Sequence, residues 1–511
     1  MKEMLSTEPR VSGDLALLNE STIPPGVRGH SGPTPHTGIV HIGLGNFHRA
    51  HLSVYTAKAI DADGGDWGIF ASSSMDRDMP AALVAQDLLY SVVDIAPGTQ
   101  AITVPAVHTA ALGCDADSAD VVAEIAKAGT KIVTLTVTEA GYTFSPSTNG
   151  LDLDSPLVQG DLAGATSPAT AIGQVTRGLQ ARALTHGAPV TVLSCDNLVD
   201  NGDHTAHLVR HFVELLPADE RGPLLAYIDS SVTFPNSMVD RIVLATDNRH
   251  RAMAAKRLGV RDAIPVPAEP FTMWVLQDNF AAGRPRWEVG GAIFTDDVAP
   301  YDLLKLRLLN GTHSLLAYLG ALDGQATIPD ARFQGFIEHA ARTLLNDEYL
   351  PTLTVPAAID ADEYIEQLFS RWSNSVLADP TSRVGSLGSV KLPQRITEPV
   401  QHHIAHGVMP ENICLTVAGF LACIAPLDGY EPGPFARAML DPAKDRLATL
   451  AAKCSTAKEL TWAVFEQGDV FAPVLAEQPG FVDRVAQYLD LIITSGIRTA
   501  AAEAARASSH H

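Results

Sequence analysis

Cysteine is scarce in this sequence and follows no pattern. The five cysteines form no C-x-x-C pair, and an odd number in a chain of 511 residues gives no disulfide framework. This usage excludes a disulfide-stabilised scaffold and is typical of a protein of the reducing cytoplasm. The cysteines are Cys114, Cys195, Cys414, Cys423 and Cys454.

Long apolar runs are missing as well. The most apolar stretch, ICLTVAGFLACIAP, is too short to span a bilayer. The first residues, MKEMLSTEPRVSGDLALL, lack the apolar core of a secretion signal. We therefore predict no membrane segment and a cytoplasmic location.

Positive charge is in deficit, because 36 Lys and Arg stand against 58 Asp and Glu and give a net charge of −22. A field of this sign repels polyanions and excludes general nucleic-acid binding. A small neutral substrate is compatible with this charge, whereas an anionic substrate needs cations placed locally.

Apolar residues are plentiful, at 46%, and the length favours two or three domains. Residues 1–37, rich in Pro, Gly and Ser, predict an extended lead-in. From Gly38, the runs IVHIGL, WGIFASSS, KIVTLTVTEAGY and APVTVLSCDN alternate with helical stretches, which is typical of an α/β fold with a mostly parallel sheet. Apolar spacings of three and four then predict a mainly α-helical second domain. The expected domains are 38–292 and 293–511.

Gly43 and Gly45 follow the first predicted strand and precede a helix, where a turn lets the backbone approach a pyrophosphate. The third glycine of G-x-G-x-x-G falls at His48, so nucleotide binding and an ordinary tight turn are equally compatible with this motif alone. Asp76 and Asp78 follow the second strand, where an acidic side chain binds the adenosine ribose. Arg77 between them favours a 2′-phosphate instead, so NAD is preferred and NADP stays open; a solvated loop is the other interpretation.

The segment YDLLKLRLLNGTHSLLAYLG predicts a helix buried on all sides, so its polar residues need a reason. At about 100° per residue, Asp302, His313 and Asn310 lie near 60°, 80° and 140° from Lys305, on one broad arc. A buried lysine with a depressed pKa is suited to act as a general base. A structural Lys–Asp pair is the alternative.

Two asparagines are candidates for stabilising a developing alkoxide, because an amide donates hydrogen bonds without changing charge. Asn310 lies on the same helix as Lys305, and Asn197 ends a strand, where ligands bind in open α/β sheets. An Asx turn is the alternative for Asn197. Neither HTAHLVRH nor QHHIAH has the companions of a zinc site, and no G-x-S-x-G elbow is present, so we predict no metal and no serine hydrolase.

At these residues the sequence resembles the polyol-specific long-chain dehydrogenases, the family of mannitol 2-dehydrogenase and fructuronate reductase. The resemblance covers most of the chain, and K-x4-N-x2-H is its most specific element. The matching segments are GIVHIGLGNFHRAH (38–51), TLTVTEAGY (134–142), SCDN (194–197), TFPNSMVDRI (233–242), EPFTMWV (269–275), KLRLLNGTH (305–313) and KLPQR (391–395).

This resemblance implies a Rossmann-type N-terminal domain, a helical C-terminal domain and metal-independent hydride transfer at substrate C2. It implies that Lys305 is the general base and that His313 orients the substrate. The other implied roles are listed by group: the oxyanion site, Asn197 and Asn310; substrate binding, Asp240, Arg383, Lys391 and Arg395; proton relay, Glu139 and Asp302, where the family commonly has a glutamate; cofactor binding, Gly43, Gly45, Asn46, Phe47, Arg49 and Asp76.

Two substrate types remain open. Mannitol and fructose are neutral, whereas mannonate and fructuronate carry a carboxylate that requires a cation. Arg395 and the stretch LDLDSPL favour a fructuronate reductase, and Arg383 favours the mannitol enzymes. The segment RVGSLGSVK lacks the acidic residue expected before Gly-Ser in either group. We predict a polyol 2-dehydrogenase, with fructuronate reductase as the alternative.

A catalytically inactive nucleotide-binding regulator is a third hypothesis. The presence of Lys305, Asn310 and His313 together argues against it. The oligomeric state does not follow from the sequence.

Overall fold

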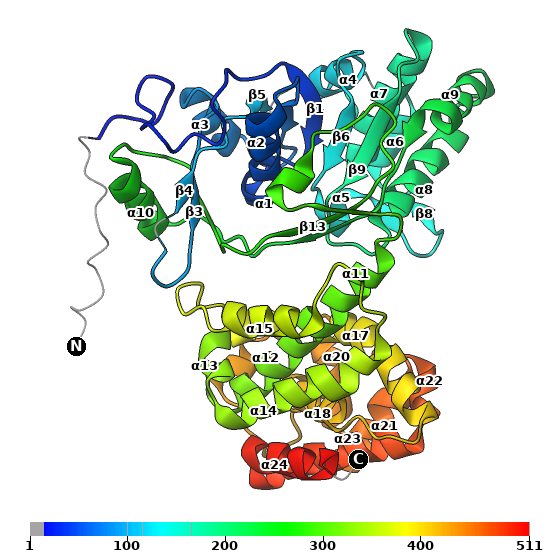
Figure 1. The fold of residues 1–511 in the computed structure, drawn as a ribbon. Coiled ribbons are helices and arrows are strands. Elements are labelled where there is room, and N and C mark those ends of the chain that lie inside the picture. The colour runs from blue at the N-terminus through cyan, green and yellow to red at the C-terminus, as the bar shows by residue number, and fades with distance from the viewer. Residues whose placement is uncertain (1–14, 100, 115, 165, 510–511) are drawn as a thin grey trace. The chain divides into compact units, whose positions relative to one another are not determined.

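The computed structural model describes residues 15–99, 101–114, 116–164 and 166–509. The chain forms two compact units, Met1–Ala299 and Pro300–His511 (Figure 1). Residues 1–14 of the predicted lead-in lie outside the described residues. The rest of the lead-in packs on the first unit, because Leu18 is buried beside Leu258 and the backbone of Leu17 bridges to Arg261.

A six-stranded sheet forms the centre of the first unit, in the order β10-β9-β6-β1-β2-β5. All five pairings are parallel, which confirms the predicted parallel sheet. This is the strand order of the Rossmann fold, and the chain changes direction between β1 and β6. The strands are β1 (Thr37–Ile42), β2 (Gly68–Ser72), β5 (His108–Leu112), β6 (Ile132–Leu135), β9 (Val190–Ser194) and β10 (Val232–Thr233).

Three small sheets complete the strands of this unit, in the orders β11-β13-β14, β12-β3-β4 and β7-β8. Their strands are β3 (Val92–Asp94), β4 (Ile102–Thr103), β7 (Phe144–Ser145), β8 (Gly150–Leu151), β11 (Ser237–Asp240), β12 (Val266–Ala268), β13 (Met273–Gln277) and β14 (Ile293–Thr295).

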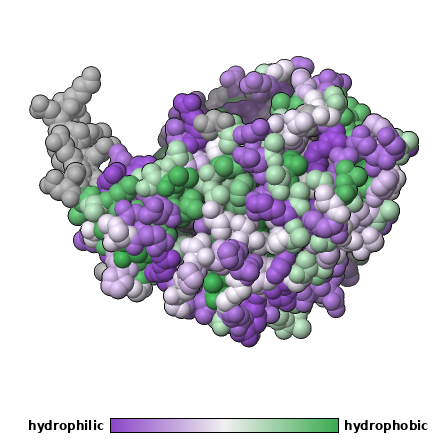
Figure 2. Space-filling model, turned by 90° about the horizontal axis from the view of Figure 1, so that it is seen from above, coloured by the Kyte–Doolittle hydropathy of each residue, from purple (hydrophilic) through white to green (hydrophobic). Residues whose placement is uncertain are grey.

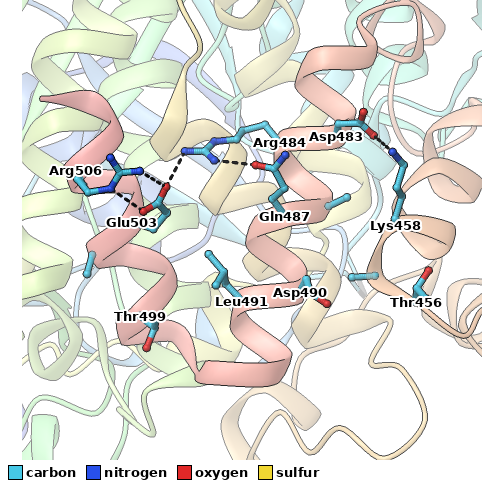
Figure 3. Close-up of a pocket in the computed structure, with 13 residues that line it drawn as sticks. Thr456, Lys458, Asp483, Arg484, Gln487, Asp490, Leu491, Thr499, Glu503 and Arg506 are labelled. Atoms are coloured by element: carbon cyan, nitrogen blue, oxygen red, sulfur yellow. Dashed lines mark hydrogen bonds and ion pairs between the residues drawn. The ribbon is translucent and has the colours of Figure 1, made fainter. Parts of the chain in front are cut away.

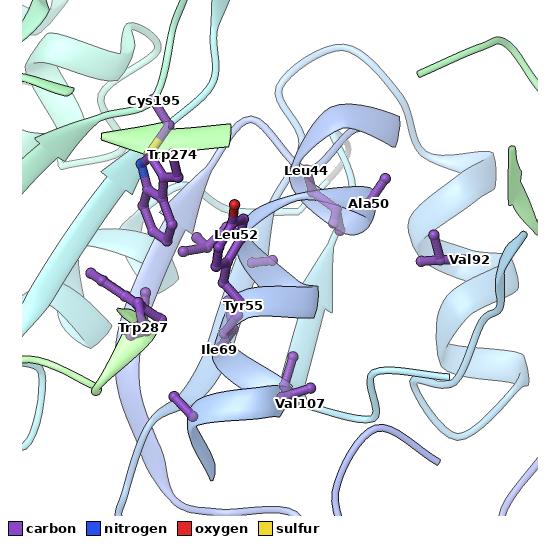
Figure 4. Packing of buried hydrophobic residues seen from close by; sticks show 14 of the residues in the cluster. Leu44, Ala50, Leu52, Tyr55, Ile69, Val92, Val107, Cys195, Trp274 and Trp287 are labelled. Atoms are coloured by element: carbon purple, nitrogen blue, oxygen red, sulfur yellow. The ribbon is translucent and has the colours of Figure 1, made fainter. Parts of the chain in front are cut away.

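Hydrophobic cores lie on both faces of the six-stranded sheet, because successive side chains of a strand point to opposite faces. On one face Ile39 packs with Tyr55, Trp274 and Trp287, whose rings lie together in Figure 4. On the other face Val40 packs with α7 and α8. The helices are α1 (Asn46–Ala50), α2 (Leu52–Asp63), α3 (Asp78–Ala85), α4 (Ala119–Ile125), α5 (Thr138–Gly141), α6 (Pro156–Leu162), α7 (Ala171–Leu184), α8 (Asn201–Glu214), α9 (Ala218–Ser231), α10 (Asn248–Leu258) and the 3-10 turn η1 (Trp287–Gly290).

The second unit is mainly helical, as the apolar spacing predicts (Figure 1). Its core helix is α18, which is the apolar run noted in the sequence and is buried along its whole length. The helices are α11 (Ala299–Leu304), α12 (Thr312–Leu322), α13 (Ile328–Arg332), α14 (Gly335–Thr343), α15 (Ala361–Trp372), α16 (Thr381–Val384), α17 (Gly388–Ala405), α18 (Glu411–Ile424), α19 (Pro434–Arg437), α20 (Lys444–Ala451), α21 (Ala457–Gln467), α22 (Pro473–Ala476), α23 (Pro479–Ser495) and α24 (Ile497–Ser508), with π-helices η2 (Lys305–Gly311) and η3 (Leu344–Tyr349) and the 3-10 turn η4 (Leu350–Thr352).

No helix within the described ranges is long and apolar enough to cross a membrane. On the face drawn in Figure 2, hydrophilic and hydrophobic residues are interspersed across the surface. Single exposed apolar side chains of this kind are normal in globular proteins.

Candidate active site

The glycine turn after β1 is fixed by the neighbouring strands. Gly43 has a φ of +109°, and a Cβ atom there would lie 2.1 Å from the carbonyl oxygen of Thr136. Only glycine fits this approach. A Cβ atom at Gly45 would contact only the carbonyl oxygen of Gly43, at 3.7 Å. The space beside Gly45 is therefore not filled by other described residues of the protein.

Three buried histidines pack beneath this turn. The rings of His41 and His48 stack with centroids 3.5 Å apart, and the Nε2 atoms of His48 and His108 lie 3.0 Å apart. Thr136 Oγ1 donates to the Gly43 carbonyl and lies 3.0 Å from His41 Nε2, so His41 carries its proton on Nε2. Burial lowers the pKa of His41 and of His108 to about 3. The cluster therefore stays neutral and holds the turn from below.

The polar side chains after the turn serve mainly to anchor it. Asn46 Nδ2 donates to the carbonyl of Leu244, and buried Arg49 donates to the carbonyl of Ile264 and to Asn46 Oδ1. Phe47 stacks on His51 with ring centroids 4.9 Å apart. These contacts hold the turn between β1 and α1 against the segment that follows β11.

Asp76 lies on an exposed loop beyond β2, as the sequence predicts. Its Oδ1 accepts hydrogen bonds from the backbone of Asp78, at 2.8 Å, and of Met79, at 3.3 Å. Arg77 forms an exposed ion pair with Asp78, 3.6 Å between Nε and Oδ1. The guanidinium that favoured NADP is thus paired with a neighbouring carboxylate.

The carboxyl ends of β6 and β9 are joined by Asp196. Its carboxylate accepts hydrogen bonds from the backbone N–H groups of Val137 and Thr138 and from the hydroxyl of Tyr142. Burial raises its pKa, which those hydrogen bonds oppose. Asp196 holds the loop of Glu139, an exposed residue of α5, to the strand end that carries Asn197.

Asp240 ends β11 and is buried, with 6% of its surface exposed. Asp196, another acidic residue near the end of a strand, was not among the predicted site residues. The available signal was its position directly before Asn197, since an acidic residue that follows a buried strand must find hydrogen-bond donors.

The predicted α-helix through Lys305 and Asn310 is interrupted by a π-helix, η2, over Lys305–Gly311. Its i→i+5 hydrogen bonds widen the turn, so residues five apart come toward one face and the α-helical angle of 140° for Asn310 is wrong. Lys305 is buried, with 9% exposed, and Asn310 is half-buried. π-Helical turns are rare and often mark functional sites.

Close packing against another π-helix accompanies this segment. A Cβ atom at Gly311 would lie 2.6 Å from the ring of Tyr349, which ends η3. The glycine of the NGTH motif therefore lets Tyr349 pack against the backbone beside Asn310.

The other two polar residues of this region lie on the flanking helices. Asp302 lies on α11, and His313, on α12, has its ring 5.6 Å from that of Trp372.

Lys391 and Arg395 lie one turn apart on α17 and form a cationic cluster with a link to η2. Arg395 Nη1 donates to Ser314 Oγ at 2.7 Å, and that hydroxyl donates to the carbonyl of Asn310 at 3.4 Å. Burial, and then the positive charges of Arg395 and Arg383, lower the pKa of Lys391 to about 8. Arg383 is more exposed and pairs with Asp379.

The histidine runs serve structural contacts. His211 Nδ1 accepts a hydrogen bond from the backbone of Leu151, and His207 Nε2 lies 2.6 Å from the carbonyl of Asn149, so both hold the β7–β8 hairpin. His403 is hydrogen-bonded to the carbonyl of Glu348. Within the described ranges, no group of three or more His, Cys, Asp or Glu side chains has the arrangement of a metal site.

A cavity of about 810 Å³ opens among α21, α23 and α24 and contains none of the predicted site residues. Figure 3 shows three ion pairs along its wall, Lys458 with Asp483 at 2.9 Å and both Arg506 and Arg484 with Glu503, whereas Asp490 carries no dashed line.

Comparison with known proteins assigns both units. The mannitol dehydrogenase Rossmann domain family matches residues 37–289, and the mannitol dehydrogenase C-terminal domain family matches residues 297–493. D-mannonate oxidoreductase of Escherichia coli (strain K12) is 36% identical over 468 residues, 90% of this chain and 94% of the relative. Mannitol 2-dehydrogenase of Cereibacter sphaeroides is 36% identical over 384 residues, 75% and 79% of the two chains.

Two solved structures share the whole architecture. The ternary complex of Pseudomonas fluorescens mannitol 2-dehydrogenase with NAD and D-mannitol is 31% identical, with a TM-score of 0.79 over 95% of this chain and 99% of that one. D-sorbitol dehydrogenase in substrate-free form is 28% identical, with a TM-score of 0.84 over the same shares. The chain therefore belongs to the mannitol dehydrogenase family and is an oxidoreductase of the mannitol 2-dehydrogenase and D-mannonate oxidoreductase type.

Proposed function

We propose that this protein transfers hydride between NAD and C2 of a linear six-carbon polyol or sugar acid, with Lys305 as general base and without a metal ion. The observation that carries the proposal is the buried Lys305 on the same π-helical segment as Asn310. A buried amine is suited to accept a proton, and a neighbouring amide is suited to bind an oxygen that gains negative charge.

The residues of the first unit fit a dinucleotide. Gly43 is required by the close approach of Thr136, and Gly45 exposes backbone without a side chain, which is what a pyrophosphate needs. We prefer NAD to NADP because Arg77 is paired with Asp78 and Asp76 lies beside them. When bound, the nicotinamide ring supplies the hydride acceptor for alcohol oxidation.

The proton steps are assigned to the chain's own side chains. In the oxidation direction Lys305 takes the proton of the C2 hydroxyl, while Asn310 and Asn197 donate hydrogen bonds to that oxygen. His313 and Asp240 orient the substrate hydroxyls. Asp302 and Glu139 return the proton to solvent, a role for which carboxylates are suited near neutral pH.

A sugar acid is the second candidate, and the cluster on α17 favours it. The positive charges of Arg395 and Arg383 lower the pKa of Lys391, which shows that cationic groups gather around its amine. In a chain of net charge −22 this is the local cation that a carboxylate requires.

Initial rates of reduction of fructose and fructuronate, each with NADH and NADPH, test the proposal. A turnover of either ketose that survives dialysis against EDTA supports metal-independent catalysis, and the ratio of the two kcat/KM values identifies the substrate class. NAD binding without any turnover would instead support a regulator, and an activity abolished by EDTA would contradict the assignment of Lys305.

A further inference from the structure

Two residues of the matching segments have no role in the proposed chemistry, Tyr142 of TLTVTEAGY and Asp196 of SCDN. Glu139, which is assigned to the proton relay, lies three positions before Tyr142. Asn197, which is assigned to the oxyanion site, directly follows Asp196. Glu139 and Asn197 are both exposed, so packing in the core does not fix them. Their places therefore depend on the backbone that carries them.

A closed ring of hydrogen bonds includes the Asp196 carboxylate. The Asp196 backbone N–H donates to Ser194 Oγ at 3.3 Å, and the hydroxyl oxygens of Ser194 and Tyr142 lie 2.6 Å apart. Tyr142 donates its only hydroxyl proton to Asp196 Oδ2 at 2.9 Å, so Ser194 donates to the Tyr142 oxygen. Asp196 and Tyr142 are buried. Hydrogen bonds linked in this way polarise one another, so the loss of one member weakens the others.

The same carboxylate holds a backbone conformation that is unfavourable for its residue. Thr138 has a φ of +65°, in the left-handed region that β-branched residues rarely adopt. Its N–H donates to Asp196 Oδ1 at 2.9 Å, and the N–H of Val137 donates to Oδ2 at 3.0 Å. Both N–H groups and the Tyr142 hydroxyl are donors, so only a carboxylate offers acceptors to all three. Asp196 therefore fixes the backbone directly before Glu139.

Asn201 extends the network to a third strand. Its buried Nδ2 donates to the carbonyls of Asp196, at 3.0 Å, and of Ser237, at 2.8 Å, and its Oδ1 accepts from the Ser237 N–H at 2.9 Å. One side-chain amide thus pairs with both backbone groups of Ser237, as a neighbouring strand would. The Asp196 carbonyl belongs to the peptide bond that leads to Asn197. Ser237 begins β11, which ends at Asp240.

We propose that Asp196 and Asn201 are positioning residues of the active site. Their hydrogen bonds fix, before substrate binds, the backbone that carries three assigned groups: Glu139, Asn197 and Asp240. This inference rests on the proposed function. Groups that are held in advance meet the substrate in a reactive geometry, which lowers the entropic cost of the reaction.

The first test exchanges the Asp196 carboxylate for an amide. Asp196→Asn keeps the shape of the side chain, but its NH2 group faces a hydrogen-bond donor. At saturating NADH, kcat/KM for the ketose that the wild type reduces should fall about 100-fold, because a displacement of reacting groups by about 1 Å costs this much. The Kd of NADH should stay at the wild-type value, since no cofactor contact is assigned to the network. Tyr142→Phe removes one donor only and should cause a smaller loss of the same kind.

Asp161→Asn is the matched control. Asp161 is buried in the same unit and accepts hydrogen bonds from two backbone N–H groups, of Ala169 and Thr170, and from the Thr170 hydroxyl. Its pattern of donors equals that of Asp196, but no assigned group lies on its loop. Asp161→Asn should lose stability in denaturant unfolding to the same extent as Asp196→Asn and keep the wild-type kcat/KM for the ketose at saturating NADH.

A rescue variant distinguishes positioning from a general loss of structure. Glycine adopts a positive φ without steric cost, so Thr138→Gly should restore part of the ketose kcat/KM when it is combined with Asp196→Asn. Thr138→Gly alone should stay close to the wild type. Hydrogen exchange of the ligand-free protein gives a second readout. The amides of Val137 and Thr138 should exchange about ten-fold faster in Asp196→Asn, because they lose their acceptor, and at the wild-type rate in Asp161→Asn.

The outcomes separate this inference from the proposed function. If Asp196→Asn loses no more ketose kcat/KM than Asp161→Asn, the positioning role is wrong and the dehydrogenase proposal stands. A loss of NADH affinity in proportion to turnover, or no recovery on adding Thr138→Gly, would also overturn the positioning role. If the wild type reduces neither fructose nor fructuronate, the proposed function fails and this inference fails with it.

Discussion

Lys305 and Asn310 lie five residues apart on one π-helical segment, with the ring of Tyr349 packed against the glycine that follows Asn310. An α-helix places residues three or four apart on one face, whereas i→i+5 hydrogen bonding brings together residues that are five apart. The K-x4-N spacing of the motif is therefore matched to a π-helical turn.

Lys305→Met should lower kcat by about 10²- to 10⁴-fold, because this is the usual contribution of a general base. NAD affinity, measured by fluorescence titration, should stay at the wild-type value, since Lys305 lies in the helical unit and carries no assigned cofactor contact. Lys458→Met, which removes an exposed ion pair with Asp483, is the matched control and should retain full activity. Retained turnover in Lys305→Met would disprove the general-base role.

Gly45→Ala should separate cofactor binding from folding. The added Cβ atom meets only the Gly43 carbonyl at 3.7 Å, so the melting temperature should change by no more than a few degrees. NAD affinity should fall at least ten-fold, because the methyl group would block the approach of the pyrophosphate. Gly43→Ala is the contrasting variant, since its Cβ atom would clash with Thr136 and destabilise the fold itself. Unchanged NAD affinity in Gly45→Ala would exclude this turn from the cofactor site.

Lys391 should give the preference for a sugar acid a pH dependence. Its pKa is lowered to about 8, so its positive charge is present below pH 8 and is lost as the pH rises through that value. The kcat/KM for fructuronate, divided by that for fructose, should therefore fall between pH 7 and pH 9, while effects of pH that are common to both substrates cancel in the ratio. In Lys391→Met the ratio should be low and independent of pH. A wild-type ratio that is constant over this range would exclude a role for this amine in carboxylate binding.

Glu348 should make the stability of the protein depend on pH near neutrality. It is buried on η3, accepts hydrogen bonds from the backbone of Asn412 and Ile413, and burial raises its pKa from 4.5 to about 7. The folded state therefore binds more protons than the unfolded state between these values, and the stability present below pH 4.5 is lost as the pH rises through 7.

Denaturant unfolding of the wild type and of Glu348→Gln at pH 5 and pH 8 checks this dependence. The free energy of unfolding of the wild type minus that of Glu348→Gln should change by up to about 3 kcal/mol between pH 5 and pH 8, since each pKa unit corresponds to about 1.4 kcal/mol. Glu366→Gln, at an exposed carboxylate, should show no comparable change. Parallel pH profiles for wild type and Glu348→Gln would contradict the raised pKa.

The sequence by itself determined the parallel sheet and the helical second half. The strands β1, β2, β6 and β9 all fall within the four predicted runs, because a strand buried on both faces needs a mostly apolar segment. The sequence also predicted that Gly43 lies in the first turn and Asn197 at a strand end, because both positions follow from the neighbouring residues along the chain. The family resemblance, which both matched domains confirm, depended on the same local motifs.

Only the tertiary structure decided how the candidate groups are arranged. An apolar pattern with spacings of three and four is the same for a continuous α-helix and for an α-helix that contains a π-helical turn. The choice between i→i+4 and i→i+5 hydrogen bonds depends on packing, such as that of Tyr349 on Gly311. The neutral histidine cluster under the turn contains side chains from distant parts of the chain. The same is true of the hydrogen-bond network that includes Tyr142, Asp196 and Asn201. Burial and pairing of such groups are properties of the folded chain, so no local pattern could predict them.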